Sequence, residues 1–346
     1  MPRYSVAQAP YGEGEAFVLH DEEAGVEARV CPAIGCNVYR FTALSGDREI
    51  DLIEAPAEAE ALRAAPTGHG IPVMIPYPGR VRNGRFQFGG RTIALPLADG
   101  RGHAIHGCVR QRSWRVIAAE TNDCASVACS IGTSDFPEML GEWPWPLEVA
   151  HTTSLRAGAL TISLQVTNRG QAPMPLGVGL HPYFRAPLGP VGDRDRCLVQ
   201  VEATHWWEQE QAFPTGRIEE LSGLVDLRAP RPIGDLPAKE TPRGSSVNEL
   251  YSRFGPAGSS PLADTGVRAS VTDPALGLRV RITTSDTFRA LVLFTPPWAP
   301  SVSPEPHTCV PDAFNVTASG IECGLIVLDP GETWAGWARF EAETAG

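Results

Sequence analysis

Short segments in which apolar and polar residues alternate recur along this chain and limit what it can fold into. The clearest segment covers residues 160–167, where Leu, Ile, Leu and Val alternate with Thr, Ser, Gln and Thr. A period of two residues is typical of a β-strand with one buried face. Residues 278–283 and 334–340 alternate in the same way, and no regular succession of strands and helices appears. The pattern predicts an all-β fold, most economically one large antiparallel sandwich.

The chain contains 346 residues, which is long enough for one large all-β domain or for two ordinary domains. No internal repeat and no change in composition marks a boundary, so we expect a single domain over residues 1–346. One brief helix is expected within 51–65, which is rich in Ala and Glu, and Pro56 places its start at about that residue.

Acidic residues outnumber basic ones. Asp plus Glu number 40 against 29 Lys plus Arg, which gives a net charge of −11. This charge disfavours phosphate backbones and anionic lipids, so we expect neither a nucleic acid nor a membrane as partner, and a neutral small molecule fits better. The sequence lacks an apolar run of about 18 residues, and its first residues do not resemble an export signal. We therefore expect a cytoplasmic protein.

The cysteines and histidines do not form metal-binding patterns. Eight cysteines are scattered without a CxxC pair, and the eight histidines do not fall at metal-ligand spacing. The thiols are expected to stay reduced, and Cys309, although close to Glu305, is expected to be a loop thiol rather than a nucleophile. No metal site is predicted.

A carboxylate lies between two prolines after a predicted buried strand. Residues 290–295 read Ala-Leu-Val-Leu-Phe-Thr and predict the strand, and residues 303–315 are interpreted as a loop that follows it. Pro304 and Pro306 stiffen the backbone on both sides of Glu305. From the residues alone two interpretations stay open: a general base whose pKa is raised by burial, or a solvated loop glutamate.

Two histidines adjoin residues that restrict or free the backbone. His181 follows a Gly-Val-Gly-Leu segment and precedes Pro182, which holds His181 in an extended conformation and gives its imidazole a fixed direction. His106 precedes Gly107, and its sequence context alone indicates a structural histidine. His181 therefore shares with Glu305 a rigid, extended setting.

Three arginines lie close together after a proline-rich connection. Arg80 ends this connection, and Arg82 and Arg85 flank an Asn83-Gly84 pair that predicts the turn of a β-hairpin. The arginines are either a solvated basic hairpin or a set of guanidinium donors for substrate hydroxyls or a phosphate.

Four motifs, taken together, resemble the aldose 1-epimerase (galactose mutarotase) family. They follow the order and spacing of that family from about residue 15 to about residue 342, and four in succession are quite specific although each alone is weak. The resemblance implies a galactose mutarotase-like β-supersandwich of large antiparallel sheets with few short helices, a sugar cleft and no cofactor. The motifs are Pro76-Tyr-Pro-Gly-Arg80 with its Asn-Gly pair, Ile105-His106-Gly107, Gly179-Leu-His181-Pro-Tyr-Phe184, and Pro304-Glu305-Pro-His-Thr with Pro311-Asp-Ala-Phe-Asn315.

The resemblance also assigns roles to individual residues. Glu305 matches the general base of the family, His181 its general acid at the ring oxygen, and His106 a second histidine near that oxygen. Arg80 matches a contact to sugar hydroxyls. Asn248 occupies the position where the family usually has a sugar-binding Asp. It is expected to bind the substrate through hydrogen bonds, although its side chain carries no charge.

These roles predict an isomerase that interconverts the α and β anomers of a hexose by acid/base ring opening and closure. The expected pH profile is bell-shaped, with an acidic limb set by Glu305 and a basic limb set by a histidine. The alternatives are a hexose-6-phosphate 1-epimerase, in which the arginines hold a phosphate, and a non-catalytic sugar-binding protein of the same fold. The expected partner is an aldohexose, and the protein is expected to be a monomer or a homodimer.

Overall fold

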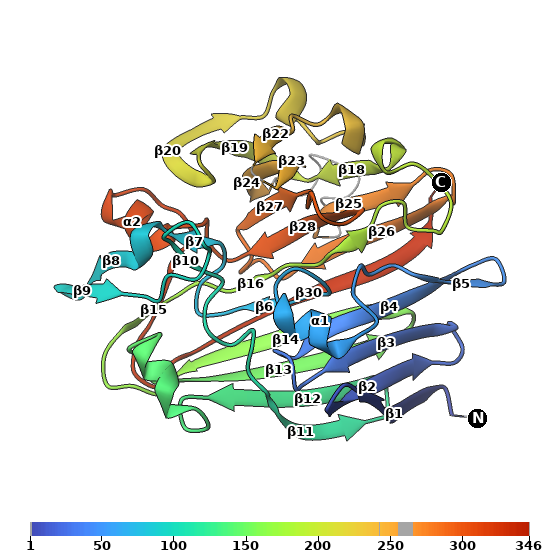
Figure 1. The fold of residues 1–346 in the computed structure, drawn as a ribbon, viewed down its shortest axis with the longest axis horizontal. Coiled ribbons are helices and arrows are strands. Elements are labelled where there is room, and N and C mark those ends of the chain that lie inside the picture. Colours follow the sequence, from blue (N-terminus) through green and yellow to red (C-terminus); the bar gives the residue numbers. More distant parts are fainter. Residues whose placement is uncertain (1, 242, 255–265, 346) are drawn as a thin grey trace.

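The computed structural model describes residues 2–241, 243–254 and 266–345 and consists mainly of antiparallel strands (Figure 1). In these residues the two α-helices have six residues each, so the predicted all-β fold is confirmed. The helix expected near Pro56 is α1 (Ala59–Ala64), and the second helix is α2 (Ala313–Ala318). None of the described helices is long and apolar enough to span a membrane. The single-domain organisation stays a prediction.

Three large sheets build the structure, and their strands are given in spatial order. The first sheet contains β1 (Tyr4–Tyr11), β2 (Gly14–Asp21), β3 (Val26–Cys31), β4 (Asn37–Ser45) and β5 (Arg48–Asp51). The second contains β11 (Arg115–Glu120), β12 (Ala125–Gly132), β13 (Leu147–Arg156), β14 (Ala159–Asn168), β30 (Thr333–Thr344), β26 (Leu278–Thr284), β25 (Val267–Asp273), β18 (Leu198–Val201) and β21 (Arg231–Pro232). The third contains β20 (Phe213–Glu220), β19 (Ala203–Glu210), β24 (Asn248–Phe254), β27 (Ala290–Phe294), β28 (Ser301–His307), β16 (Gly179–Leu180) and β6 (Val73–Met74), with β17 (Phe184–Arg185) also paired to β28.

Smaller elements connect these sheets. The two-stranded pairs are β7 (Arg80–Val81) with β10 (Ala104–Ile105), β8 (Arg85–Phe88) with β9 (Arg91–Ala94), β15 (Met174–Leu176) with β29 (Ile326–Leu328), and β22 (Lys239–Thr241) with β23 (Gly244–Ser246). The 3₁₀-helices are η1 (Arg82–Gly84), η2 (Pro137–Gly141), η3 (Arg194–Arg196), η4 (Gly223–Val225) and η5 (Ile233–Asp235).

The alternating segment 160–167 forms most of β14, as predicted. Its four aliphatic side chains are buried, while the residues between them are mostly half-buried or exposed. β14 lies between β13 and β30, and one apolar cluster joins the buried face of this sheet to residues of β2, β3 and β4. Burial of these side chains is what fixes the register, since a shift by one residue would turn them to the other face.

The segment that carries Glu305 is not a loop, which corrects the sequence-based expectation. Residues 301–307 form β28, with β27 on one side and the short β16 and β17 on the other. The carbonyl of His307 accepts from the amide of Arg289 on the β27 side, and the amide of Thr308 donates to Val178 on the other side. Alternation therefore directs the nitrogens of Pro304 and Pro306 away from β27, toward the gap between β16 and β17, where no N–H is needed.

The predicted hairpin turn at Asn83-Gly84 is also wrong. Both residues have positive φ angles, of 53° and 57°, as such a turn requires. However, β7 pairs with β10, and β8 turns back through Gly89-Gly90 to pair with β9. Asn83-Gly84 therefore forms a 3₁₀ connection between two different strand pairs, because β7 pairs with β10, some twenty residues further along the chain, and not with β8.

Gly107 provides a test of the backbone geometry that holds His106. Its φ angle is +66°, and a Cβ atom would lie 1.9 Å from the carbonyl oxygen of Ile75. Gly89 has a similar φ angle of +56° but no atom within 4 Å of such a Cβ. We expect Gly89→Ala to lower the free energy of unfolding by about 1 kcal/mol and Gly107→Ala by about 3 kcal/mol or more, measured by urea unfolding. Equal losses would contradict the steric argument.

Candidate active site

Strand β28 directs three polar side chains to one face of the third sheet. Ser303, Glu305 and His307 alternate with the two prolines, and all three are buried. Because side chains two residues apart in a strand share a face, Ser303 and His307 flank Glu305 at close range. Val292 of β27 lies opposite Glu305 in the register and shields it on that side.

Glu305 lies between two imidazoles. Its Oε1 atom is 3.2 Å from Nε2 of His181, and its Oε2 atom is 3.1 Å from Nε2 of His307. His181 comes from the end of β16, more than a hundred residues away in the sequence, so the sheet assembles this group. The sequence analysis did not single out His307 or Ser303. The signal that could have revealed them is the Ser-x-Glu-x-His alternation, which has meaning only when the segment is taken as a strand.

Contacts on three sides hold the His181 imidazole. Its ring stacks on Tyr183 with a centroid distance of 4.5 Å and an interplanar angle of 12°. The Nδ1 atom is 2.8 Å from the hydroxyl of Ser303, and the Nε2 atom is 3.3 Å from the hydroxyl of Tyr183. Phe294 of β27 packs edge-on against the ring at 5.8 Å.

These contacts determine which nitrogen of His181 carries a proton. The hydroxyl of Tyr183 donates its single proton to the carbonyl of Thr67 at 2.7 Å. Its oxygen can therefore only accept from Nε2 of His181, which also faces the carboxyl oxygen of Glu305. The Nε2 atom thus bears a proton and points it at Glu305, and in the neutral imidazole Nδ1 accepts from Ser303.

His106 lies beside His181. The two rings meet edge to face with a centroid distance of 5.6 Å. The backbone of His106 has a φ angle of 61°, and its amide donates to the carbonyl of Gly79 at 2.9 Å. Although three imidazoles and a carboxyl group converge here, no group of three or more such side chains in the described residues is arranged to hold a metal ion.

Burial drives the groups of this cluster toward their neutral forms. It raises the pKa of Glu305 well above its usual range, although the guanidinium of Arg80 opposes the shift. Burial lowers the pKa of His181 to about 3, and neighbouring His307 and Arg80 contribute. Burial together with the charges of nearby histidines and arginines keeps the pKa of His106 well below its usual range. Burial therefore favours the carboxyl form of Glu305 and the neutral imidazole of His181.

The three arginines that follow the proline-rich segment do not form one fork. Nε of Arg80 donates to Asp99 at 2.9 Å, whereas Arg82 lies 3.7 Å from Asp312 and stacks over Phe213. Arg85 is exposed at the start of β8. The Asp99 carboxylate is enclosed, yet amide donors from His103 and Arg101 and the ion pair with Arg80 lower its pKa. Arg80 is thus held by a fixed anion near Glu305.

Asn248 lies on the same face of the sheet as Glu305. It pairs with Phe294 across β24 and β27, and Phe294 pairs in turn with Ser303 of β28. Residues directly opposite in antiparallel strands project to the same side, so these three side chains form one row. Asn248 is half-buried, and its backbone carbonyl accepts from the side-chain amide of Gln209 at 3.1 Å. Its neighbour Glu249 is buried on the other face, with Trp206 and Lys239.

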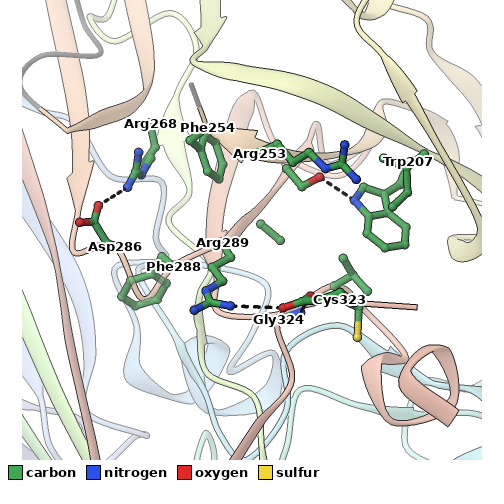
Figure 2. A pocket seen from close by; sticks show the side chains of 14 residues that line it. Trp207, Arg253, Phe254, Arg268, Asp286, Phe288, Arg289, Cys323 and Gly324 are labelled. Atoms are coloured by element: carbon green, nitrogen blue, oxygen red, sulfur yellow. Dashed lines mark hydrogen bonds and ion pairs between the residues drawn. The ribbon is translucent and has the colours of Figure 1, made fainter. Parts of the chain in front are cut away.

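A separate hollow of about 500 Å³ lies elsewhere on the third sheet, lined in part by Trp207 and by arginines (Figure 2). Each arginine there already has a partner: His205 for Arg253, Asp286 for Arg268 and Glu322 for Arg289. Neither Glu305 nor His181 lines this hollow. The candidate active site is therefore the buried cluster around Glu305, where a carboxyl group, two imidazoles and a hydroxyl lie close together.

Comparison with known proteins places this site in a family. The family model of aldose 1-epimerase matches residues 17–341 of the chain. The structure resembles a galactose mutarotase-like protein from Clostridium acetobutylicum, with a TM-score of 0.83, 21% identity and 99% of each chain covered. It also resembles galactose 1-epimerase from Lactobacillus acidophilus, with a TM-score of 0.76, 17% identity and 100% of each chain covered.

Among curated proteins, the uncharacterized YihR of Escherichia coli strain K12 is 25% identical over 271 residues, which are 77% of each protein. The two structures share the fold of this chain, and they confirm the predicted galactose mutarotase-like architecture of large antiparallel sheets. The family match extends over nearly the whole sequence and includes every residue of the cluster around Glu305. The chain belongs to the aldose 1-epimerase family.

Proposed function

We propose that this protein is a mutarotase that interconverts the α and β anomers of a free aldohexose without a cofactor. The observation that carries the proposal is the buried pair of Glu305 and His181, whose Oε1 and Nε2 atoms are 3.2 Å apart. Ring opening of a sugar requires a base at the anomeric hydroxyl and an acid at the ring oxygen. Both oxygens are bonded to C1, so a closely spaced acid/base pair matches the substrate.

In the proposed reaction Glu305 removes the proton from the hydroxyl on C1 while His181 delivers a proton to the ring oxygen. The bond between C1 and the ring oxygen breaks, and a carbonyl group forms at C1. Rotation about the C1–C2 bond exposes the other face of the aldehyde. The ring oxygen then attacks that face as His181 takes back its proton and Glu305 returns one to the oxygen on C1, so no proton is gained or lost over the cycle.

The reactive form requires a carboxylate and an imidazolium, whereas burial favours a carboxyl group and a neutral imidazole. The two forms contain the same number of protons and differ in the place of one shared proton. It is on the carboxyl group of Glu305 in one form and on Nδ1 of His181 in the other, because Nε2 of the neutral imidazole already bears a proton. His106 would assist at the ring oxygen, and Arg80 and Asn248 would bind sugar hydroxyls. Three placements support these roles: His106 lies beside His181, Arg80 lies near Glu305, and Asn248 lies in the same row as Ser303.

Polarimetry on freshly dissolved sugars tests the activity. We expect the protein to accelerate the mutarotation of α-D-glucose or α-D-galactose over buffer, and to prefer free glucose over glucose 6-phosphate in kcat/KM. The reason is that Asp99 and Asp312 already pair with Arg80 and Arg82, which reduces their attraction for a phosphate. A preference for the phosphate ester would favour a hexose-6-phosphate 1-epimerase, and sugar binding without turnover would favour a non-catalytic binding protein.

Substitutions test the roles of the residues. Glu305→Gln and His181→Asn should each lower kcat by about 10²-fold or more with a much smaller change in KM, because each removes a proton-transfer group. Arg80→Ala should chiefly raise KM. Glu23→Gln, at an exposed glutamate, is the matched control and should leave the kinetics unchanged. Near-wild-type kcat in folded Glu305→Gln, verified by circular dichroism, would refute the assignment of the base.

The pH dependence of kcat/KM tests the state of the pair. Burial favours an assignment opposite to the one expected from the sequence, because it raises the pKa of Glu305 and lowers the pKa of His181. Activity should fall at alkaline pH, as the pair loses its shared proton, with a midpoint well above the ordinary glutamate pKa of about 4.3. The acidic limb should lie near pH 3, where the pair gains a second proton. A histidine-like acidic limb near pH 6.5 would contradict this proposal.

A further inference from the structure

His307 is a buried histidine that the proposed reaction does not use. It lies two residues after Glu305 on β28, between Ala290 of β27 and Gly179 of β16 in the strand register. Its side chain is completely buried, and its carbonyl accepts from the amide of Arg289 at 3.0 Å. The backbone of His307 is thus fixed by strands on both sides, which leaves its imidazole little freedom.

The surroundings of His307 are shaped to the imidazole. A Cβ atom on Gly179 would lie 2.8 Å from Cδ2 of His307, 2.8 Å from the terminal methyl of Met74 and 2.7 Å from Cβ of Pro78. Only a residue without a side chain therefore fits at position 179 while the ring keeps its place. Close packing of this kind holds the ring in a single orientation.

The hydrogen bonds of His307 are unusual for a buried histidine. Its Nε2 atom is 3.1 Å from Oε2 of Glu305, and its Nδ1 atom has no hydrogen-bond partner within the described part of the chain. Burial lowers the pKa of His307 to about 3, so the ring is neutral and carries one N–H proton. An apolar side chain could fill the same space without burying an unpaired nitrogen, so packing alone does not explain a histidine here.

We propose that His307 is a positioning residue for Glu305, whose Oε2 accepts the Nε2–H of the neutral imidazole. This inference rests on the proposed function. The hydrogen bond fixes the plane of the carboxyl group and leaves Oε1 directed at His181 and the substrate. It also favours the carboxylate over the carboxyl form, which moves the shared proton from Glu305 toward His181 and increases the fraction of the reactive form.

The other groups around Glu305 do not replace this donor. Arg80 stabilises the carboxylate by its charge, but its Nε atom is engaged by Asp99. His181 donates to the other carboxyl oxygen, and burial raises the pKa of Tyr183 so that it stays a neutral phenol. His106 stays neutral because burial lowers its pKa. His307 is therefore the group that sets the state of Oε2.

Kinetics of two variants test the proposal. His307→Leu removes the donor but fills similar space, so Glu305 should hold the shared proton more tightly. We expect the alkaline limb of kcat/KM to move up by about one pH unit and kcat to fall about tenfold, with KM nearly unchanged. His307→Gln keeps an N–H donor and should lie closer to the wild type. If His307 had a purely structural role, His307→Leu would reduce the folded fraction without moving the alkaline limb of the kcat/KM profile. That result would overturn the proposal.

Nuclear magnetic resonance tests the same claim without activity. In protein labelled with ¹³C-glutamate, the carboxyl signal that disappears in Glu305→Gln should titrate about one pH unit higher in His307→Leu than in the wild type. Replacement of the equally buried His151 in β13 by Gln is the control and should leave this titration unchanged. An unchanged titration in His307→Leu would overturn the inference, whether or not the protein turns over a sugar. A lack of sugar turnover would by itself refute only the proposed function.

A measurement on the wild type covers the case in which His307→Leu does not fold. In ¹⁵N-histidine spectra at pH 7, the proton of His307 should reside on Nε2 and not on Nδ1. A proton on Nδ1 would show that His307 accepts from a protonated Glu305. It would then stabilise the carboxyl form and not the carboxylate, which is the opposite of the proposal.

Discussion

The central interaction of this structure is a carboxyl group enclosed between two imidazoles on the face of a sheet. Glu305 contacts His181 through one oxygen and His307 through the other, and water has almost no access to it. An isolated carboxylate in such a place would be costly, so the side chain either takes up a proton or receives hydrogen bonds on both oxygens. Burial raises the pKa of Glu305 and so favours the first solution, while the neighbouring strands place an imidazole at each oxygen. Much of the local sequence serves to keep these imidazoles in place.

The scaffold explains why the site tolerates so many prolines and glycines. Pro304 and Pro306 occur on the side of β28 where the neighbouring strands are interrupted, so they cost no ladder hydrogen bond while they stiffen the strand that carries Glu305. Gly179 leaves room for the ring of His307, and Gly107 lets the backbone beside His106 approach the carbonyl of Ile75. Rigidity and close approach together fix groups that come from distant parts of the sequence.

Local pattern was enough to predict the fold class and to draw attention to Glu305 and His181, but the roles expected for these two residues came from the family resemblance. The alternation in β14 indicated a half-buried strand, and the prolines beside Glu305 and His181 indicated fixed side chains. The same prolines led to the wrong interpretation of β28 as a loop, which concealed His307 and Ser303. The partners of Arg80 and of β7 could not be predicted, because Asp99 and β10 meet them only through tertiary contacts. Sequence periodicity shows which way a side chain points, but not which distant residue faces it.

The arrangement also limits the electrostatic cost of acid/base chemistry in a buried site. In the proposed reaction one proton shared by Glu305 and His181 leaves the pair with no net charge in either form. Its transfer converts two neutral groups into an ion pair but does not change the net charge of the site. A neutral sugar, the proposed substrate, would enter such a site without a further charge to bury or compensate. His307 acts on this balance as a neutral dipole, since burial keeps its pKa at about 3. A cationic group at the same place would hold the carboxylate so strongly that it would lose its basicity, whereas a neutral imidazole orients the carboxylate and leaves it able to accept a proton.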